Sequence, residues 1–270
     1  MKIKQHRQFA CLALASLALV TAVNATTTTY TTGDLFIGFH KSGVDSDYLI
    51  NIGQASIYST ASASGTMTLS LGSIGSDLVS IFGSGWATDS TVKWGVAGTT
   101  RLATVGADAP MTIYASRAGN VESATRAVGT ATAWNSAAAL GTPVSKIHSM
   151  ASAYRSKNST ANSSVGLVQT NIGTSSNNAY ASFQPSGSNT GTGNLAFGYF
   201  NPTIEGSVTS SLALFRLLEG NTNPANAVGT FAISGSGDSA TISFEAVPEP
   251  ASVALGLLSS MMLMTRRRRN

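Results

Sequence analysis

Short runs rich in β-branched and aromatic residues recur along the chain, and clusters of Gly, Ser and Asn separate them. Apolar runs of this length between turn-forming residues predict short strands, whose successive side chains point to opposite faces. In the clearest pair, alternate large residues such as Phe231 and Ile233 fall on one face, and a Gly-Ser-Gly-Asp-Ser loop joins the two strands. The expected strands are 34–40, 48–52, 67–71, 91–96, 111–116, 195–200, 211–218, 229–234 and 240–245.

Two segments show the periodicity of a helix. The shorter is 76–82, and the longer is 143–157, for which Thr142 is the expected N-cap and Pro143 the first helical residue. The longer segment has an apolar stripe made of Val144, Ile147, Ala151 and Tyr154.

Residues 158–194 are rich in Asn, Ser, Thr and Gly, which predicts a long loop or a flexible insertion within a domain that spans 26–246. Many short strands at this spacing are typical of a sandwich. We therefore expect a mainly β fold, an antiparallel sandwich-like domain with one or two short helices, flanked by an N-terminal signal helix and a C-terminal transmembrane helix.

The first 25 residues have the organisation of a secretory signal peptide. A basic start is followed by an apolar segment, 9–20, and by small residues that favour cleavage after Ala25. A retained anchor helix is the alternative, but the apolar segment is short for the ~20 residues that a span needs. The only cysteine, Cys11, lies in this segment, so the processed chain would contain no thiol and no disulfide.

The last 24 residues, 247–270, have three parts. Pro248, Glu249 and Pro250 precede the uncharged segment 251–265, and four arginines follow it: Arg266, Arg267, Arg268 and Arg269. A helix of this length spans ~22 Å at 1.5 Å per residue, and snorkelling arginines can extend it towards the ~30 Å of the hydrocarbon core. The positive-inside rule keeps the arginines cytoplasmic while the body is exported.

This Pro-Glu-Pro, apolar helix and arginine order resembles the PEP-CTERM sorting signal of Gram-negative bacteria. The resemblance implies recognition of Pro248, Glu249 and Pro250 by a membrane-embedded, cysteine transpeptidase-like exosortase, with the arginines as the stop-transfer segment. It also implies transient anchoring in the inner membrane, then transfer to the cell surface or matrix and an association with exopolysaccharide and biofilm. The two prolines keep the motif extended and accessible at the membrane face. A plain tail anchor is the alternative.

The body also resembles uncharacterised exported PEP-CTERM proteins, many from Verrucomicrobia-like bacteria, for which no activity is implied. The similar segments are Gly-Asp-Leu-Phe-Ile-Gly-Phe at 33–39, Asp-Tyr-Leu-Ile-Asn-Ile-Gly at 47–53, 81–86, 93–98 and 113–117.

The basic excess of the chain belongs to its ends. The whole sequence has 16 Lys and Arg against 12 Asp and Glu, but 26–247 has nine against eleven, a net charge of 9 − 11 = −2. The body therefore lacks a net basic surface for nucleic acid. Its charged fraction, 10% over the chain, is low against the roughly 25% of ordinary soluble domains.

No residue pattern in the body indicates catalysis, a cofactor or a metal. The two histidines outside the leader, His40 and His148, have no ligand spacing, and a serine triad with so few candidate bases is improbable. Asp45 and Asp47 alternate as in a calcium loop but lack its Gly and Glu, so solvated turn acids are the preferred interpretation.

Trp86 and Trp94 could stack on a glycan, although core packing is the preferred alternative. The sequence thus predicts a non-enzymatic exported surface or matrix protein whose partners are signal peptidase, an exosortase and exopolysaccharide. A carbohydrate-binding module is the second hypothesis, and a hydrolase is a weaker third.

Overall fold

The structure is a computed structural model, and it describes residues 22–24, 30–61, 66–121, 137–157, 166–170, 179–181, 204–218 and 225–247. The strands are β1 (Ala22–Asn24), β2 (Asp34–Lys41), β3 (Ser46–Gln54), β4 (Thr66–Ser70), β5 (Val92–Thr99), β6 (Ile113–Ala118), β7 (Gly166–Thr170), β8 (Glu205–Ser207), β9 (Leu212–Leu217), β10 (Asn226–Ser236) and β11 (Ser239–Ala246). The helices are α1 (Ala55–Ser59), α2 (Ile74–Phe82), a 3-10 turn η1 (Trp86–Thr88) and α4 (Ala137–Lys157).

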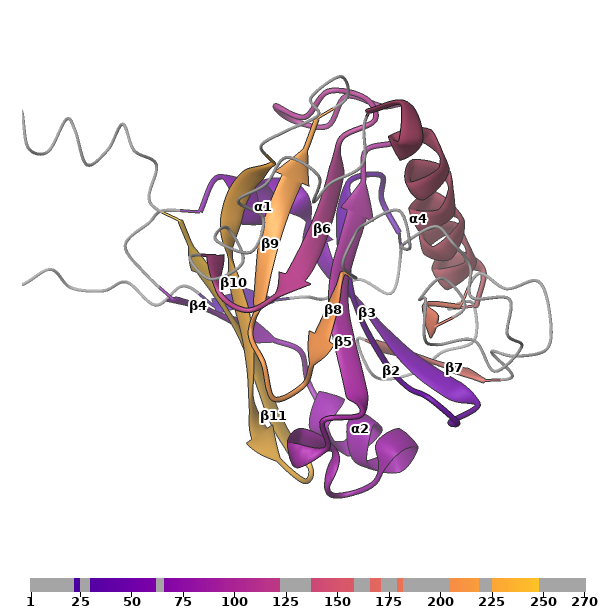
Figure 1. Cartoon of the computed structure of the whole chain (residues 1–270), viewed down its shortest axis with the longest axis vertical. Helices are drawn as coiled ribbons and strands as arrows, with labels where there is room; N and C mark the ends of the chain where they lie inside the picture. The colour runs from indigo at the N-terminus through magenta and orange to yellow at the C-terminus, as the bar shows by residue number, and fades with distance from the viewer. Residues whose placement is uncertain are drawn as a thin grey trace, which may run out of the picture.

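The described strands form one curled sheet (Figure 1). Its order is β1-β4-β11-β10-β9-β6-β5-β2-β3-β7, with β8 paired to β5 beside this path. Every pair is antiparallel except β1 with β4, which run parallel. The predicted mainly β, antiparallel fold is confirmed. The sandwich is replaced by a single sheet whose curl brings distant strands to face each other.

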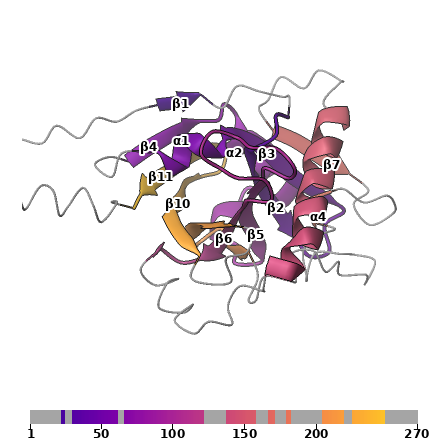
Figure 2. The same cartoon turned by 90° about the horizontal axis from the view of Figure 1, so that it is seen from above.

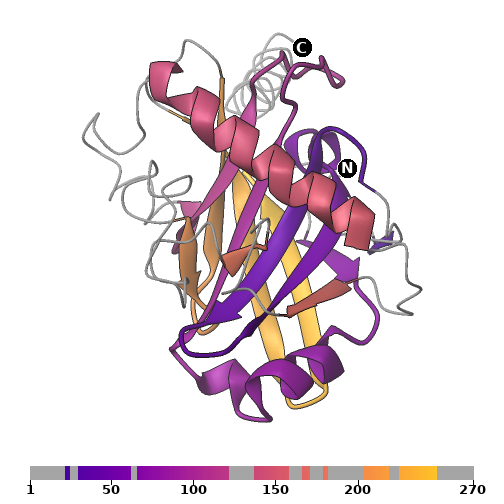
Figure 3. The same cartoon turned by 90° about the vertical axis from the view of Figure 1, so that its right-hand side faces the viewer.

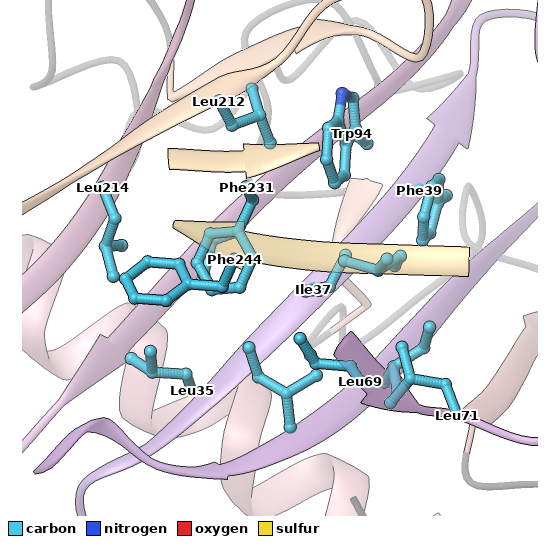
Figure 4. Close-up of a cluster of buried hydrophobic side chains, with 14 of the residues drawn as sticks. Leu35, Ile37, Phe39, Leu69, Leu71, Trp94, Leu212, Leu214, Phe231 and Phe244 are labelled. Atoms are coloured by element: carbon cyan, nitrogen blue, oxygen red, sulfur yellow. The ribbon is translucent and has the colours of Figure 1, made fainter. Parts of the chain in front are cut away.

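The inner face of the curl holds the larger core. Phe39 of β2 stacks on Trp94 of β5 with ring centroids 6.0 Å apart, and Phe231 of β10 lies 4.7 Å from Phe244 of β11. Figure 4 shows these side chains pointing towards one another from both halves of the sheet. Alternation produces this arrangement, because in β2 Leu35, Ile37 and Phe39 face inward while the residues between them face outward.

Helix α4 covers part of the outer face (Figure 3). The predicted stripe is confirmed, since Val144, Ile147, Ala151 and Tyr154 are all buried against the sheet, and Tyr154 meets Phe36 edge-on at 5.2 Å. The predicted start at Pro143 is wrong, because the helix begins at Ala137 and Pro143 lies inside it. Residues 137–140, Ala-Ala-Ala-Leu, are strong helix formers and extend the helix ahead of the proline.

All predicted strands except 195–200 overlap an observed strand, and 195–200 lies outside the described residues. The predicted helix 76–82 is confirmed as α2. The region expected as a loop, 158–194, contributes β7 at 166–170, whose Gly-Leu-Val-Gln-Thr run is β-prone but lies between Asn- and Ser-rich flanks.

Most of the predicted leader and all of 251–265 lie outside the described residues. Among the residues that are described, no helix is both long and apolar enough to cross a bilayer.

Candidate functional site

The sheet ends where the Pro-Glu-Pro motif begins. β11 ends at Ala246, which is paired with Gly229 of β10, and the Val247 N–H donates a last hydrogen bond to the Val228 carbonyl at 3.0 Å. Pro248, Glu249 and Pro250 follow directly but lie outside the described residues, as do Arg266 to Arg269. Proline has no N–H with which to extend a ladder, so the sequence itself sets the end of the strand at this point.

After β1, the chain enters β2 at the same end of the sheet from which β11 leaves. β2 begins at Asp34 opposite Gln54, and the register through β5, β6, β9 and β10 places this end beside the end of β11. We call it the terminal end of the sheet.

The buried carboxylate of Asp34 holds the entering chain at the terminal end. It accepts hydrogen bonds from the Thr31 N–H and from the Asn51 amide, both at 2.8 Å, and from the Gln54 amide. The last residues before the motif and the segment from Thr31 to Asp34 are therefore both tied to the sheet.

Ala25, the predicted cleavage site, lies outside the described residues, but the three residues before it form β1. β1 pairs with β4 in the register Ala22 to Thr68, Val23 to Leu69 and Asn24 to Ser70. The expected cleavage point thus directly follows a strand of the sheet.

The two tryptophans expected as a glycan platform lie inside the molecule. Trp86 is 1% exposed, and its indole N–H donates to the Gly237 carbonyl at 2.9 Å. Trp94 is 0% exposed, and its indole N–H lies 3.0 Å from the carbonyls of both Ser207 and Ser210. This burial contradicts glycan stacking and agrees with core packing, since each ring lies in the core and each N–H donates to a carbonyl of a segment distant in the chain.

A buried polar cluster lies on the outer face of the sheet, at the opposite end from the termini. It consists of His40 of β2, Asp47 of β3, Glu205 of β8 and Tyr180. The His40 Nδ1 lies 2.8 Å from Glu205 Oε1, and the Tyr180 hydroxyl donates to the same oxygen at 2.7 Å. Asp47 accepts the Ala181 N–H at 2.7 Å, so the prediction of solvated turn acids is wrong for this residue.

Burial and charge determine the protonation of this cluster. Burial alone would lower the pKa of His40, but attraction to Glu205 and, more weakly, to Asp47 outweighs it, and the pKa is raised. Burial, followed by the charge of Glu205, raises the pKa of Tyr180 well above its ordinary value. The pairing with Glu205 thus favours the protonated form of His40, and the cluster joins 179–181 to β2, β3 and β8.

Sequence reasoning missed this cluster because its members are far apart in the chain. The one available signal was that His40 and Asp47 flank a predicted turn between two strands, which places them across from each other in a hairpin. The contributions of Tyr180 and Glu205 come from segments without a strand or helix pattern of useful length.

His148 is the other histidine of the body. Its Nε2 lies 3.2 Å from the Ser152 hydroxyl on the next turn of α4, and its Nδ1 lies 3.2 Å from the Tyr30 hydroxyl. Burial, followed by the charge of Arg101, lowers its pKa. In a serine hydrolase one histidine nitrogen faces the serine and a carboxylate orients the other nitrogen. In His148 the nitrogen that does not face Ser152 lies beside the Tyr30 hydroxyl instead of a carboxylate.

Within the described ranges, no group of three or more His, Cys, Asp or Glu residues is placed to hold a metal ion. Comparison of the chain with models of protein families, with curated proteins and with solved structures gives no match in any of the three.

Proposed function

We propose that this is an exported, non-enzymatic protein of the cell surface or extracellular matrix, sorted through its C-terminal signal by an exosortase. Signal peptidase would remove 1–25, the 251–265 helix would hold the body transiently at the inner membrane, and processing at Pro248, Glu249 and Pro250 would release or transfer it. The exported body would then act in exopolysaccharide or biofilm.

The observation that supports this proposal best is the position of the motif relative to the sheet. Among the described residues, Val247 is the last to make a backbone hydrogen bond, and the next residue opens the motif. Cleavage there would leave every strand of the sheet intact. A cut a few residues earlier would remove the pairing of β11 with β10 and with β4.

The short distance between the end of the sheet at Val247 and the start of the apolar segment at Ala251 also limits where processing can occur. The four residue-to-residue steps from Val247 to Ala251 span at most ~14 Å, because an extended chain advances ~3.3–3.6 Å per residue. The terminal end of the sheet would therefore lie close to the membrane surface. An enzyme that cuts the motif must act within that narrow layer, which fits a membrane-embedded protease better than a soluble one.

Intact mass spectrometry of the protein from its native host, by cell fraction, tests this proposal. We expect a form that starts at Thr26 and ends between Val247 and Pro250, outside the inner membrane. The double variant Pro248→Ala and Pro250→Ala should accumulate in the inner membrane with Arg266 to Arg269 retained, whereas Pro110→Ala, in a loop of the body, should be processed as the parent is.

Unchanged processing of the double variant would contradict recognition of the motif. A parent protein that keeps its arginines in the inner membrane would instead indicate a plain tail anchor, and the sorting proposal would have to be abandoned.

A further inference from the structure

The strand that precedes the predicted cleavage site completes one edge of the sheet. β4 is paired with β11 on one side, in the register Leu69 to Ile242 and Met67 to Phe244. On its other side it is paired with β1 alone among the described strands, and Figure 2 shows β1 lying beside it.

Removal of the leader would take this partner away. Cleavage after Ala25 removes all three residues of β1, and the backbone N–H and C=O groups of β4 that face it lose their partners. An edge of this kind is a ready template for another strand, and natural proteins usually protect it with charges, proline or a bulge.

β4 carries none of these protections. Its sequence, Thr-Met-Thr-Leu-Ser, has no charge and no proline, and its register with β11 is regular. Met67 and Leu69 point into the core, while Thr66 and Ser70 are exposed and Thr68 is partly exposed. The low net charge of the body, nine basic against eleven acidic residues, does not oppose the approach of a second copy.

We propose that signal-peptide cleavage frees the β4 edge and that β4 then pairs antiparallel with β4 of a second copy of this chain. The inference rests on the proposed export. A two-fold axis through Thr68 places Thr68 opposite Thr68 and Thr66 opposite Ser70, so the outward side chains form Thr–Thr and Thr–Ser pairs, which are favourable across antiparallel strands. The same patch serves both partners, as an isologous dimer requires.

This arrangement also gives β1 a role before export. While the leader is attached, β1 occupies the edge within its own chain, so the precursor does not associate through it. Removal of the leader and exposure of the pairing edge become a single event, on the outer side of the membrane.

Disulfide crosslinking of the full chain in its native host tests the proposal. In a Cys11→Ser background, Thr68→Cys introduces the only thiol, at a position where two opposed Cα atoms lie within the 4.4–6.8 Å that a disulfide allows. Ser243→Cys is the matched control, because Ser243 is the direct neighbour of Thr68 on β11 but lies one strand in from the edge. Adding Ala25→Phe should block cleavage and retain β1.

On a non-reducing gel after oxidation of intact cells, we expect Thr68→Cys to shift to a band of twice the mass. Ser243→Cys and the blocked precursor should stay monomeric. As a second measurement, Thr68→Lys and Thr68→Glu should each abolish self-association in co-purification, and co-expression of the two should restore it as a mixed dimer.

A cleaved Thr68→Cys chain that stays monomeric, together with no mixed dimer from the Lys and Glu variants, would overturn the pairing. Equal crosslinking of the blocked precursor would overturn the role of β1. The mass of the monomer distinguishes a failure of edge pairing from a failure of export. A parent chain that keeps residues 1–25 contradicts both the proposed function and the edge pairing. A cleaved chain that stays monomeric contradicts the edge pairing alone.

Discussion

Replacing Gly38 by Ala should destabilise the fold, because the aromatic ring of Tyr180 occupies the space that a side chain would need. A Cβ built on Gly38 would lie 2.2 Å from Tyr180 Cδ2 and 2.3 Å from its Cγ. These are rigid ring atoms next to the backbone of 179–181, so the clash cannot be relieved by bending the end of a flexible chain. A Cβ built on Gly95, on the neighbouring strand, would lie 2.6 Å from the hydroxyl of the same tyrosine.

The magnitude follows from the two ways in which the protein can respond. If the sheet and Tyr180 shift apart locally, the cost is that of overpacking, about 1–3 kcal/mol. If the ring is expelled, the protein loses a fully buried aromatic side chain, worth about 3–5 kcal/mol, and Glu205 loses the 2.7 Å hydrogen bond from Tyr180. We expect the free energy of unfolding to fall by about 2–4 kcal/mol.

Urea unfolding of the purified exported protein, followed by fluorescence, measures this change. Gly85→Ala is the matched control, because Gly85 has ordinary backbone angles and open space where its Cβ would lie, and it should change stability by less than about 0.5 kcal/mol. In a double-mutant cycle, Tyr180→Ala should remove most of the cost of Gly38→Ala, since the added methyl then meets no ring. A Gly38→Ala protein as stable as the parent, or strictly additive effects in the cycle, would refute the placement of Tyr180 against β2.

Two further predictions concern buried groups. Trp94→Phe keeps the stack on Phe39 but leaves the Ser207 and Ser210 carbonyls without their indole donor. It should therefore lower the free energy of unfolding by about 1–3 kcal/mol without changing retention on exopolysaccharide. A loss of retention at unchanged stability would favour a glycan platform instead. The raised pKa of His40 stabilises the fold below its ordinary value of about 6.5, and this contribution is lost as the pH rises through the raised pKa. Urea midpoints across this range should therefore fall with pH in the parent and stay flatter in His40→Gln, and equal slopes in the two proteins would contradict the assignment.

The elements that the sequence predicts well are those with a complete local signal. Large apolar residues alternate in the β10–β11 hairpin, and the apolar stripe of α4 is continuous, so the type and the buried faces of these elements follow from the pattern alone. The curl into one sheet depends instead on pairings between strands that are distant in the chain, such as β4 with β11. Alternation indicates that such strands have a buried face but not which strands lie opposite them.

The buried polar cluster was unpredictable for a related reason. The raised pKa of His40 depends on Glu205, which is 165 positions later in the chain (205 − 40), and Tyr180 donates to the same carboxylate from a third distant segment. Gly38 and Gly95 illustrate the same limit, because a glycine in a strand signals a close approach without identifying what approaches. The terminal motifs behave in the opposite way: their signal is entirely local, and the structure adds only the point at which the sheet meets them.

The geometry at the two ends of the body explains how both proposed cuts could leave the fold intact. Removal of β1 takes away backbone hydrogen bonds from one side of β4, but the side chains that anchor β4, Met67 and Leu69, remain packed opposite Phe244 and Ile242 of β11. Cleavage after Val247 likewise leaves the last ladder bond in place. None of these described core contacts involves a residue that the cuts would remove, whereas the β4 edge loses its partner. If both cuts occur as proposed, the chain would gain a free β4 edge while the described core contacts between β4 and β11 remain.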